Sequence, residues 1–216
     1  TDCRRFWGDY RGGRIDEEEI KQVESQLAPT GGTCGVMGTA STMACMTEAL
    51  GMMLPGGAAI PAVYAERLRH GESAGKRAVG LAVEGLKPSK IMTSAAFKNA
   101  LRVLLAVGGS TNGIIHITAV AGRLGIEVDL ASFDEMGKET PVLIDLKPSG
   151  QYYMDDLYRA GGLGAILREL KPLLNLDCLT ITGRTLGEEI DASPEAFSQN
   201  VVFPIDNPIF QGGGIA

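Results

Sequence analysis

Apolar residues recur along most of this chain at every third or fourth position, which is the spacing of one face of a helix. Asp16, followed by three glutamates, is a good start for the first such helix, and Pro29 is a stop for it. Methionine and leucine at positions 43, 46, 50 and 53 form the next face. Further helices are predicted over 61–69, over 72–84 with Val79 and Val83 facing inward, and over 94–105, 114–124, 132–136, 154–160, 163–170 and 185–190.

Three shorter segments have the composition of β-strands. Residues 141–146 are apolar almost throughout, as a strand covered on both faces would be. Residues 126–130 are short and β-prone, and 178–183 are predicted as another strand. Together with the helices, these segments predict an α/β fold that is rich in helix, with a small, mostly parallel sheet flanked by helices.

Composition and charge argue against several classes of function. Of the 216 residues, 44% are apolar and 21% are charged, which is ordinary for a globular protein of one large or two small domains. The net charge of −6, without a basic cluster, disfavours a nucleic-acid partner, and no apolar run has the length of a membrane span. Four cysteines without a C-x-x-C pair, and only two histidines, disfavour a zinc site and predict reduced thiols in a cytoplasm.

One loop concentrates the residue types of a ligand site. Residues 31–43 read Gly-Gly-Thr-Cys-Gly-Val-Met-Gly-Thr-Ala-Ser-Thr-Met and run straight into an apolar helix. Glycines let the backbone approach a ligand, and the hydroxyl groups of Thr33, Thr39, Ser41 and Thr42 can cap a helix whose N-terminus attracts anions. A structural role for Cys34 stays open, because most free cysteines are buried and inert. Its surroundings favour a metal or cluster.

Glycine and hydroxyl residues precede a predicted helix a second time, at Ser110, Thr111 and Asn112. One interpretation is a helix cap between two packed helices. The other is a polar pocket wall in which these three residues bind a carboxylate or hydroxyl of a substrate. His116, one turn into the following helix, is interpreted as a core histidine and not as a base, because its helix is rich in isoleucine.

Four motifs stand in a fixed order along the chain. They are the 31–43 loop with Glu-Ala-Leu-Gly-Met and Leu-Pro at 48–55, Gly-Gly-Ser-Thr-Asn at 108–112, Asp-Leu and Ala-Gly-Gly at 156–162, and Asp-Cys-Leu-Thr-Ile-Thr-Gly with Thr-Leu-Gly-Glu at 177–188. Together they resemble the dihydroxy-acid dehydratase / phosphogluconate dehydratase family over most of residues 4–215. The chain is similar to most of the second half of that family's N-terminal domain.

The resemblance implies a hydro-lyase that converts a 2,3-dihydroxy acid to a 2-keto acid. In the family, three cysteines hold an iron–sulfur cluster with one open iron for the leaving hydroxyl, magnesium holds the carboxylate, and a serine alkoxide removes a proton. A poor leaving group and an enolate-like charge both need such positive centres. Cys34 matches the third cluster cysteine. Cys45 and Cys178 are interpreted as structural, and no ligand role is carried over to Cys3.

Only part of the family's machinery matches this chain. The family's Cys-Asp-Lys segment does not occur in the sequence, and the serine base belongs to the family's C-terminal domain. The chain is therefore expected to be an internal piece without catalytic residues of its own. Residues 1–199 would be part of the N-terminal cluster-binding domain, and 200–216, with two prolines and three glycines, a linker and the start of the next domain.

The substrate is expected from two positions of the loop. Ser41 and Gly38 stand where the branched-chain enzymes of the family more often carry Asn and Tyr. This difference favours an arabinonate-type sugar-acid (aldonate) dehydratase that forms a 2-keto-3-deoxy acid, and with it a [2Fe-2S] cluster over a [4Fe-4S] cluster. A sugar acid is then the small-molecule partner, and the full-length enzyme is expected to be a cytoplasmic homo-oligomer.

Three alternatives stay beside this interpretation. The first is a dihydroxy-acid dehydratase of branched-chain amino acid biosynthesis. The second is that the 216-residue chain, taken alone, is a non-catalytic structural module, because two cluster ligands, the magnesium site and the base are missing. The third is an unrelated anion-binding α/β domain that uses the loops at Gly31 and Gly108, which the ordered motifs disfavour.

Overall fold

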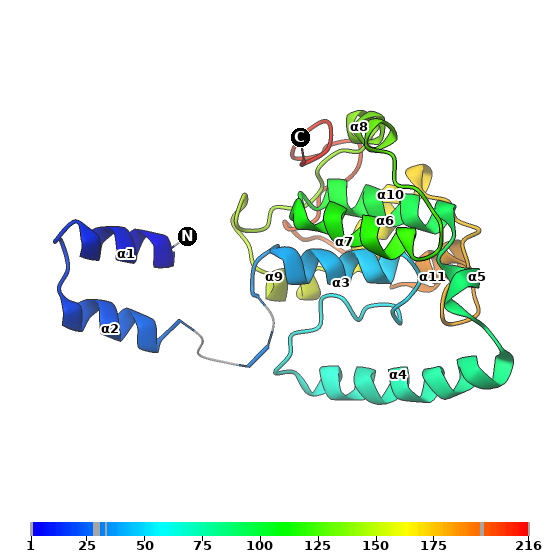
Figure 1. Ribbon diagram of the computed structural model, residues 1–216, viewed down its shortest axis with the longest axis horizontal. Coiled ribbons are helices and arrows are strands. Elements are labelled where there is room, and N and C mark those ends of the chain that lie inside the picture. The colour runs from blue at the N-terminus through cyan, green and yellow to red at the C-terminus, as the bar shows by residue number, and fades with distance from the viewer. Residues whose placement is uncertain (1, 28–30, 33, 195–196, 216) are drawn as a thin grey trace. The chain divides into compact units, whose positions relative to one another are not determined.

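The computed structural model describes residues 2–27, 31, 32, 34–194 and 197–215, with side chains from residue 4 onward. The chain divides into two compact units, Thr1–Gly32 and Thr33–Ala216. Helices supply nearly all of the regular structure in both units (Figure 1). None of the helices in the described ranges is long and apolar enough to cross a membrane.

The first unit is a pair of helices, α1 (Asp2–Arg11) and α2 (Glu17–Ser25). Asp16 caps α2 as predicted: its carboxylate accepts the N–H of Glu19 at 2.8 Å, and the Glu19 carboxylate accepts the N–H of Asp16 at 3.1 Å. This reciprocal pair satisfies two of the N–H groups that a helix start leaves without partners. The predicted stop, Pro29, lies outside the described residues.

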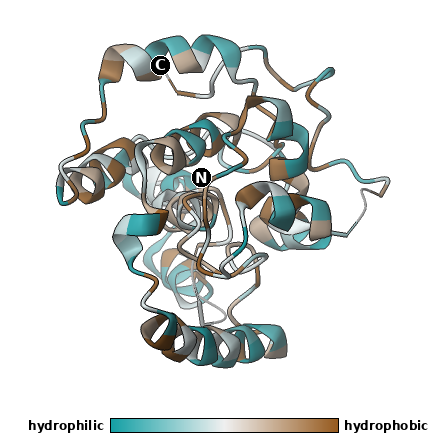
Figure 2. Ribbon diagram, turned by 90° about the vertical axis from the view of Figure 1, so that its right-hand side faces the viewer, coloured by the Kyte–Doolittle hydropathy of each residue, from teal (hydrophilic) through white to brown (hydrophobic). Residues whose placement is uncertain are grey.

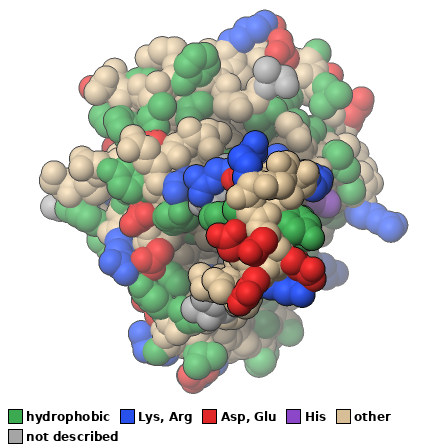
Figure 3. Space-filling model, turned by 90° about the vertical axis from the view of Figure 1, so that its left-hand side faces the viewer, with side chains coloured by type: hydrophobic (Ala, Val, Ile, Leu, Met, Phe, Trp, Pro, Cys, Tyr) green, Lys and Arg blue, Asp and Glu red, His purple; other side chains and the backbone are tan. Residues whose placement is uncertain are grey.

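Most exposed charged residues of α1 are arginines, and most of those of α2 are glutamates. Figure 3 shows blue and red side chains in two groups on the face nearest the viewer. Trp7 meets Tyr10 edge to face at 5.7 Å, and Ile20 is the buried apolar residue of α2. The exposed arginines of α1 are Arg4, Arg5 and Arg11, and the exposed glutamates of α2 are Glu17, Glu18, Glu19 and Glu24.

Helix α3 (Thr39–Ala49) separates two apolar cores in the second unit. Cys45 and Ala49 face one core, which includes α9 (Met154–Arg159) and α10 (Gly162–Leu170). Met46 and Leu50 face the other, which includes α6 (Ser94–Ala106), α7 (Asn112–Gly122) and α8 (Leu130–Glu139). Figure 1 shows α3 beside α6 and α7. The predicted methionine stripe is therefore core packing: Met43, Met46 and Leu50 belong to one core, and Met53, beyond the end of α3, packs against the other.

Several predicted helix boundaries are confirmed by the local geometry. The pair α9 and α10 breaks at Gly161 and Gly162, whose φ angles of 102° and 62° favour glycine. Thr185 caps α11 (Leu186–Ala192) by accepting the N–H of Glu188 at 3.3 Å. Two further elements are short, α5 (Pro88–Ile91) and the 3-10 helix η1 (Lys171–Leu173).

The expected parallel sheet does not occur among the described residues. Segment 141–146 is extended, but it makes only isolated bridges, antiparallel from Val142 to Phe210 and from Ile144 to Val202, and parallel from Leu146 to Tyr152. Parallel strands need a long crossover to a second strand. The chain after 146 makes a tight turn back to Tyr152 and then forms α9 and α10, so the apolar run is covered by helices instead.

The other two strand predictions are also wrong in the described residues. Leu130, at the end of segment 126–130, begins α8, and Leu179 in segment 178–183 makes one bridge to Thr185. The segment after Asn200 contributes to the body of the second unit, because Val201 and Val202 are buried in the core beside α9 and α10. The domain division at 199 stays a prediction.

Residues 61–69 and 72–84, predicted as two helices, form a single helix from 65 onward, α4 (Ala65–Glu84). Val79 and Val83 were expected to face inward, and they are 67% and 84% exposed. Polar groups tie the helix region to the body, since Arg77 donates to the carbonyl of Ile181 and the Tyr64 hydroxyl donates to Asp155 at 2.8 Å. The periodicity predicted an apolar face but not which elements would pack against it. Figure 2 shows apolar residues of α4 in brown, at the lower edge of the picture.

Candidate functional site

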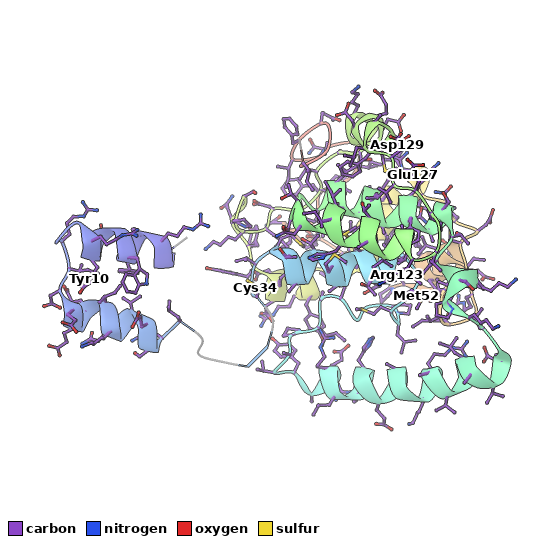
Figure 4. The ribbon with its side chains drawn as sticks, in the orientation of Figure 1. Tyr10, Cys34, Met52, Arg123, Glu127 and Asp129 are labelled. Atoms are coloured by element: carbon purple, nitrogen blue, oxygen red, sulfur yellow. The ribbon has the colours of Figure 1, made fainter. Side chains whose placement is uncertain are left out.

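Cys34 lies exposed on the loop that leads into α3 (Figure 4). Ser41, in the first turn of α3, donates its hydroxyl to the carbonyl of Val36 at 2.9 Å, and the Cys34 carbonyl lies 3.3 Å from the same oxygen. The N-cap of α3 is Gly38, which has no side chain to cap the helix. The hydroxyl of Ser41 was predicted to cap the helix. It instead holds the loop in place.

The loop folds back toward the helix start. The Cys34 sulfur lies 3.7 Å from the position that a Cβ on Gly38 would take, an ordinary van der Waals distance. Two main-chain hydrogen bonds fix the loop from outside: the N–H of Met37 donates to the Lys147 carbonyl at 2.8 Å, and the N–H of Met154 donates to the Gly35 carbonyl at 2.9 Å. The backbone beside Cys34 is thus held on both sides by segments from the far half of the chain.

Lys147 and Tyr153 lie next to this loop and were missed by the sequence analysis. The Lys147 ammonium donates to the Tyr153 hydroxyl at 2.7 Å and lies 4.2 Å from the centre of its ring. A Cβ on Gly35 would come within 3.9 Å of that ring. The pair places a cation and an aromatic ring beside the Cys34 loop. Neither residue belongs to a motif used above, and only the fold brings them to the loop.

The structure brings the two predicted loops together. Ser110 and Thr39, 71 positions apart, share a hydrogen bond of 2.9 Å between their hydroxyl oxygens. The Asn112 side-chain amide donates to the Thr39 hydroxyl at 3.1 Å, and the N–H of Ser110 donates to the Thr42 hydroxyl at 3.0 Å. The start of α3, at Thr39, therefore meets the start of α7, at Asn112.

Glycine permits this close approach. A Cβ on Gly109 would lie 2.8 Å from both Leu104 Cδ1 and Thr42 Cγ2, and one on Gly113 would lie 3.2 Å from Thr42 Cγ2. Thr111 is the N-cap of α7 and is exposed. The predicted helix start at 110–112 is thus present. The hydroxyl and amide groups of Thr39, Ser110 and Asn112 form one polar patch where α3 and α7 begin.

His116 is exposed, so its interpretation as a core histidine is wrong. Helix α7 buries Gly113, Ile117 and Ala121, which recur at a spacing of four residues. His116 and Ile115 lie on the exposed part of the helix surface. An isoleucine-rich sequence did not decide which side faced the core.

Two ionisable groups inside α3 lie on its buried side. Burial, and then the charge of Glu48, raise the pKa of the Cys45 thiol to about 12. Burial also raises the pKa of Glu48 to about 7, although its carboxylate accepts the N–H groups of Gly56 at 2.7 Å and Ala58 at 2.8 Å. Cys45 is thus a protonated core thiol. Cys178 is half-buried, and burial raises its pKa too.

The donor set fits one ligand of a metal cluster. Cys34 is an exposed thiol in a loop bounded by glycines, whereas Cys45 and Cys178 are at least partly buried. Within the described ranges, no group of three His, Cys, Asp or Glu side chains converges. Those ranges therefore contain one exposed thiol suited to a cluster and no complete metal site.

An apolar cavity lies elsewhere in the second unit. Its volume is about 280 Å³, and residues lining it include Met53, Leu167, Ile190 and Phe197. Neither Cys34 nor any of the three residues at 110–112 lines it. The polar patch at the starts of α3 and α7 is therefore separate from this cavity.

The class of the chain is shown by comparison with known protein families. A family model described as "Dihydroxy-acid/6-phosphogluconate dehydratase N-terminal" matches residues 1–189. The chain belongs to this family. The match spans Cys34 and the Ser110 loop.

Among its relatives are proteins named "Dihydroxy-acid dehydratase". The one from Caldicellulosiruptor saccharolyticus is 46% identical over 211 residues, which cover 96% of this chain and 38% of the relative. The one from Methanococcoides burtonii is 46% identical over 213 residues, covering 97% and 38%. The one from Acetivibrio thermocellus is 43% identical over 211 residues, covering 97% and 38%. The chain thus spans 38% of the length of these relatives.

Proposed function

We propose that the full-length protein containing this chain is a hydro-lyase that dehydrates a 2,3-dihydroxy acid to a 2-keto acid. The observation that carries the proposal is the meeting of the exposed Cys34 loop with the hydroxyl and amide groups of Ser110 and Asn112 in a chain of this family. The relatives' name favours a dihydroxy-acid dehydratase, the branched-chain alternative, over the sugar-acid expectation.

Cys34 would be one thiolate ligand of an iron–sulfur cluster. When bound, such a cluster supplies a Lewis acid for the leaving hydroxyl. Ser41 would keep the loop in register by its hydrogen bond to the Val36 carbonyl, and the main-chain bonds to Lys147 and Met154 would hold the loop from outside. The chain's own part in the chemistry is thus to place one sulfur at a defined point.

The polar patch would bind the acid end of the substrate. The N-termini of α3 and α7 converge there, and helix N-termini carry partial positive charge and favour anions. The hydroxyl groups of Ser110 and Thr111 and the amide of Asn112 would add donors for a carboxylate or hydroxyl. No group of three carboxylate, thiol or imidazole side chains converges in the residues described, so the proposal assigns no magnesium ligands to them.

The test uses the full-length protein with Cys34→Ser. We expect loss of iron, sulfide, visible absorption and dehydratase activity. Cys178→Ser is the control, because this thiol is half-buried and lies beside Thr93 and Asn99, and it should retain all four properties. Retention of iron and sulfide in Cys34→Ser would remove Cys34 from the cluster.

The same preparation decides two finer points. The iron-to-protein ratio and the spectrum distinguish [2Fe-2S] from [4Fe-4S]. The ratio of kcat/KM for a branched-chain 2,3-dihydroxy acid against a sugar acid identifies the substrate class, and we expect it to favour the branched-chain acid. A ratio that favours the sugar acid would restore the expectation based on Ser41 and Gly38.

A second proposal concerns the 216-residue chain by itself. We propose that it folds as a non-catalytic module, because its described residues bring together one cluster ligand and no complete metal site. Iron and sulfide analysis after anaerobic reconstitution tests this. A stoichiometric cluster on the chain alone would refute it.

A further inference from the structure

Three glycines near the C-terminal end of the chain, residues 212–214, form a strap against α6 and α8 (Figure 1, in red). The N–H of Gly213 donates to the carbonyl of Gly137, in the last turn of α8, at 2.6 Å. The N–H of Gly214 donates to the carbonyl of Leu105, in the last turn of α6, at 3.1 Å. The strap is thus tied to two helices, although the sequence analysis expected a linker there.

Two glycines of the strap are required by space and not by backbone conformation. The φ angles of Gly213 and Gly214 lie outside the left-handed region in which glycine is favoured. A Cβ on Gly214 would nevertheless lie 2.5 Å from the Cα of Gly108 and 3.2 Å from its nitrogen. These distances are shorter than an ordinary contact of about 3.5–4.0 Å. A side chain at position 214 must therefore displace either the strap or the backbone at Gly108.

Gly108 begins the turn that leads into the polar patch. The N–H of Gly108 donates to the Leu105 carbonyl at 3.2 Å, and the N–H of Gly109 donates to the Leu104 carbonyl at 3.0 Å. These are the two hydrogen bonds of a Schellman helix end, and Ser110 of the polar patch follows directly. The Leu105 carbonyl therefore accepts one N–H from the turn and one from the strap.

Helix α3 contacts the same turn. A Cβ on Gly109 would lie 2.8 Å from Thr42 Cγ2, and the N–H of Ser110 donates to the Thr42 hydroxyl at 3.0 Å. The turn is therefore in close contact with the strap at Gly108 and with α3 at Gly109. Because closely packed atoms transmit a displacement, a shift at Gly108 should disturb the hydrogen bond of Ser110 to α3.

We propose that Gly214 is a positioning residue for the polar patch: the strap holds the turn at Gly108 against α3 and so sets where Ser110 and Asn112 present their donors. The expected effect on the reaction rests on the proposed substrate-binding function of the patch. The coupling between the strap and the turn does not, because it can be measured on the backbone. Gly214 therefore acts on Ser110 from 104 positions away, through one glycine contact.

The first test is amide hydrogen exchange in the full-length protein. Gly214→Ala should quicken exchange of the Ser110 N–H about tenfold, because its hydrogen bond to Thr42 is weakened. The N–H of Ile181, which donates to the Gly51 carbonyl at 2.8 Å, is the internal reference and should keep its wild-type rate. A general loss of stability would quicken both amides equally, and that result would overturn the proposal.

Gly187→Ala is the matched control. Gly187 lies on α11, and its Cβ would come within 3.2 Å of the Leu176 Cβ, so this alanine is also crowded. Leu176 packs against the core that includes α9 and α10. Exchange at Ser110 should therefore keep its wild-type rate in Gly187→Ala. Wild-type exchange at Ser110 in Gly214→Ala, or equal exchange in both variants, would overturn the proposal.

Steady-state kinetics of the same variants separate positioning from packing. Gly214→Ala should raise KM for the 2,3-dihydroxy acid about fivefold and leave kcat within about twofold, because the patch would bind the acid end equally in the ground state and the transition state. Iron and sulfide content should not change. Faster exchange at Ser110 with a wild-type KM would support the role of the strap and remove the patch from substrate binding, which contradicts the proposed function instead.

A gentler variant keeps the test decisive if Gly214→Ala does not fold. The Ile215 side chain packs against the core that includes α6 and α7, and Ile215→Ala would loosen the strap without overlap. Exchange at Ser110 should again quicken while exchange at Ile181 stays at the wild-type rate. Unchanged exchange at Ser110 in Ile215→Ala would overturn the proposal.

Discussion

Glu48 makes the stability of the second unit depend on pH in a defined direction. Its carboxylate is buried within α3, and burial raises its pKa from 4.5 to about 7. Above pH 4.5 the unfolded chain loses this proton, while the folded protein retains it until about pH 7. Ionisation therefore costs the folded state more, and the free energy of unfolding falls as the pH rises through this window and levels off above it.

The shift of about 2.5 pH units corresponds to about 3 kcal/mol across the window. Most of this loss, about 2.5 kcal/mol, lies between pH 5 and pH 8. Urea unfolding at pH 5, 6, 7 and 8 measures it. The perturbation is Glu48→Gln, which removes the titrating group but keeps the shape of the side chain.

Glu48→Gln is expected to flatten the pH dependence by that amount. It is also expected to be less stable by about 1–3 kcal/mol at pH 5, because an amide nitrogen cannot accept the N–H of Gly56 or Ala58, each of which donates to a carboxyl oxygen of Glu48. Glu135→Gln, whose side chain is 72% exposed, is the control and should keep the wild-type slope. If Glu48→Gln keeps that slope as well, the buried carboxylate does not titrate in this window, and the reasoning fails.

Two further predictions concern the loops at the site. Ser41→Ala should lower the free energy of unfolding by about 1 kcal/mol and speed amide hydrogen exchange in the loop before α3. Thr47→Ala, which loses a hydrogen bond in the same helix, should not change that exchange. Equal exchange in both variants would contradict the role of Ser41. Gly109→Ala should lower the free energy of unfolding, measured in urea, by about 1–3 kcal/mol, because its Cβ would overlap Thr42. Gly122→Ala, where a Cβ has open space, should not destabilise the protein. If Gly109→Ala is tolerated equally well, the close approach at Gly109 is contradicted.

Local chemistry allowed several elements to be read from the sequence. The cap at Asp16, the start of the last helix at Thr185 and the break at Gly161 depend on groups within a few residues of each other. The family motifs placed Cys34 in its loop, and the structure leaves that thiol exposed. Such features depend on backbone conformation and short-range hydrogen bonds, which the sequence specifies directly.

Only the tertiary structure decided what covers each apolar segment. Segment 141–146 has the composition of a buried strand, and helices bury it; Val79 lies on an apolar face, and that face is exposed. Hydrophobic periodicity states that a face is apolar, and burial depends on which distant elements pack there.

The meeting of the two loops has the same origin. Thr39 and Ser110 come within hydrogen-bond distance because α3 packs on α6 and α7, and no local signal links positions 71 residues apart. The sequence by itself therefore determined the local elements and the family motifs. The packing of α3 determined that two of those motifs lie together in one polar patch.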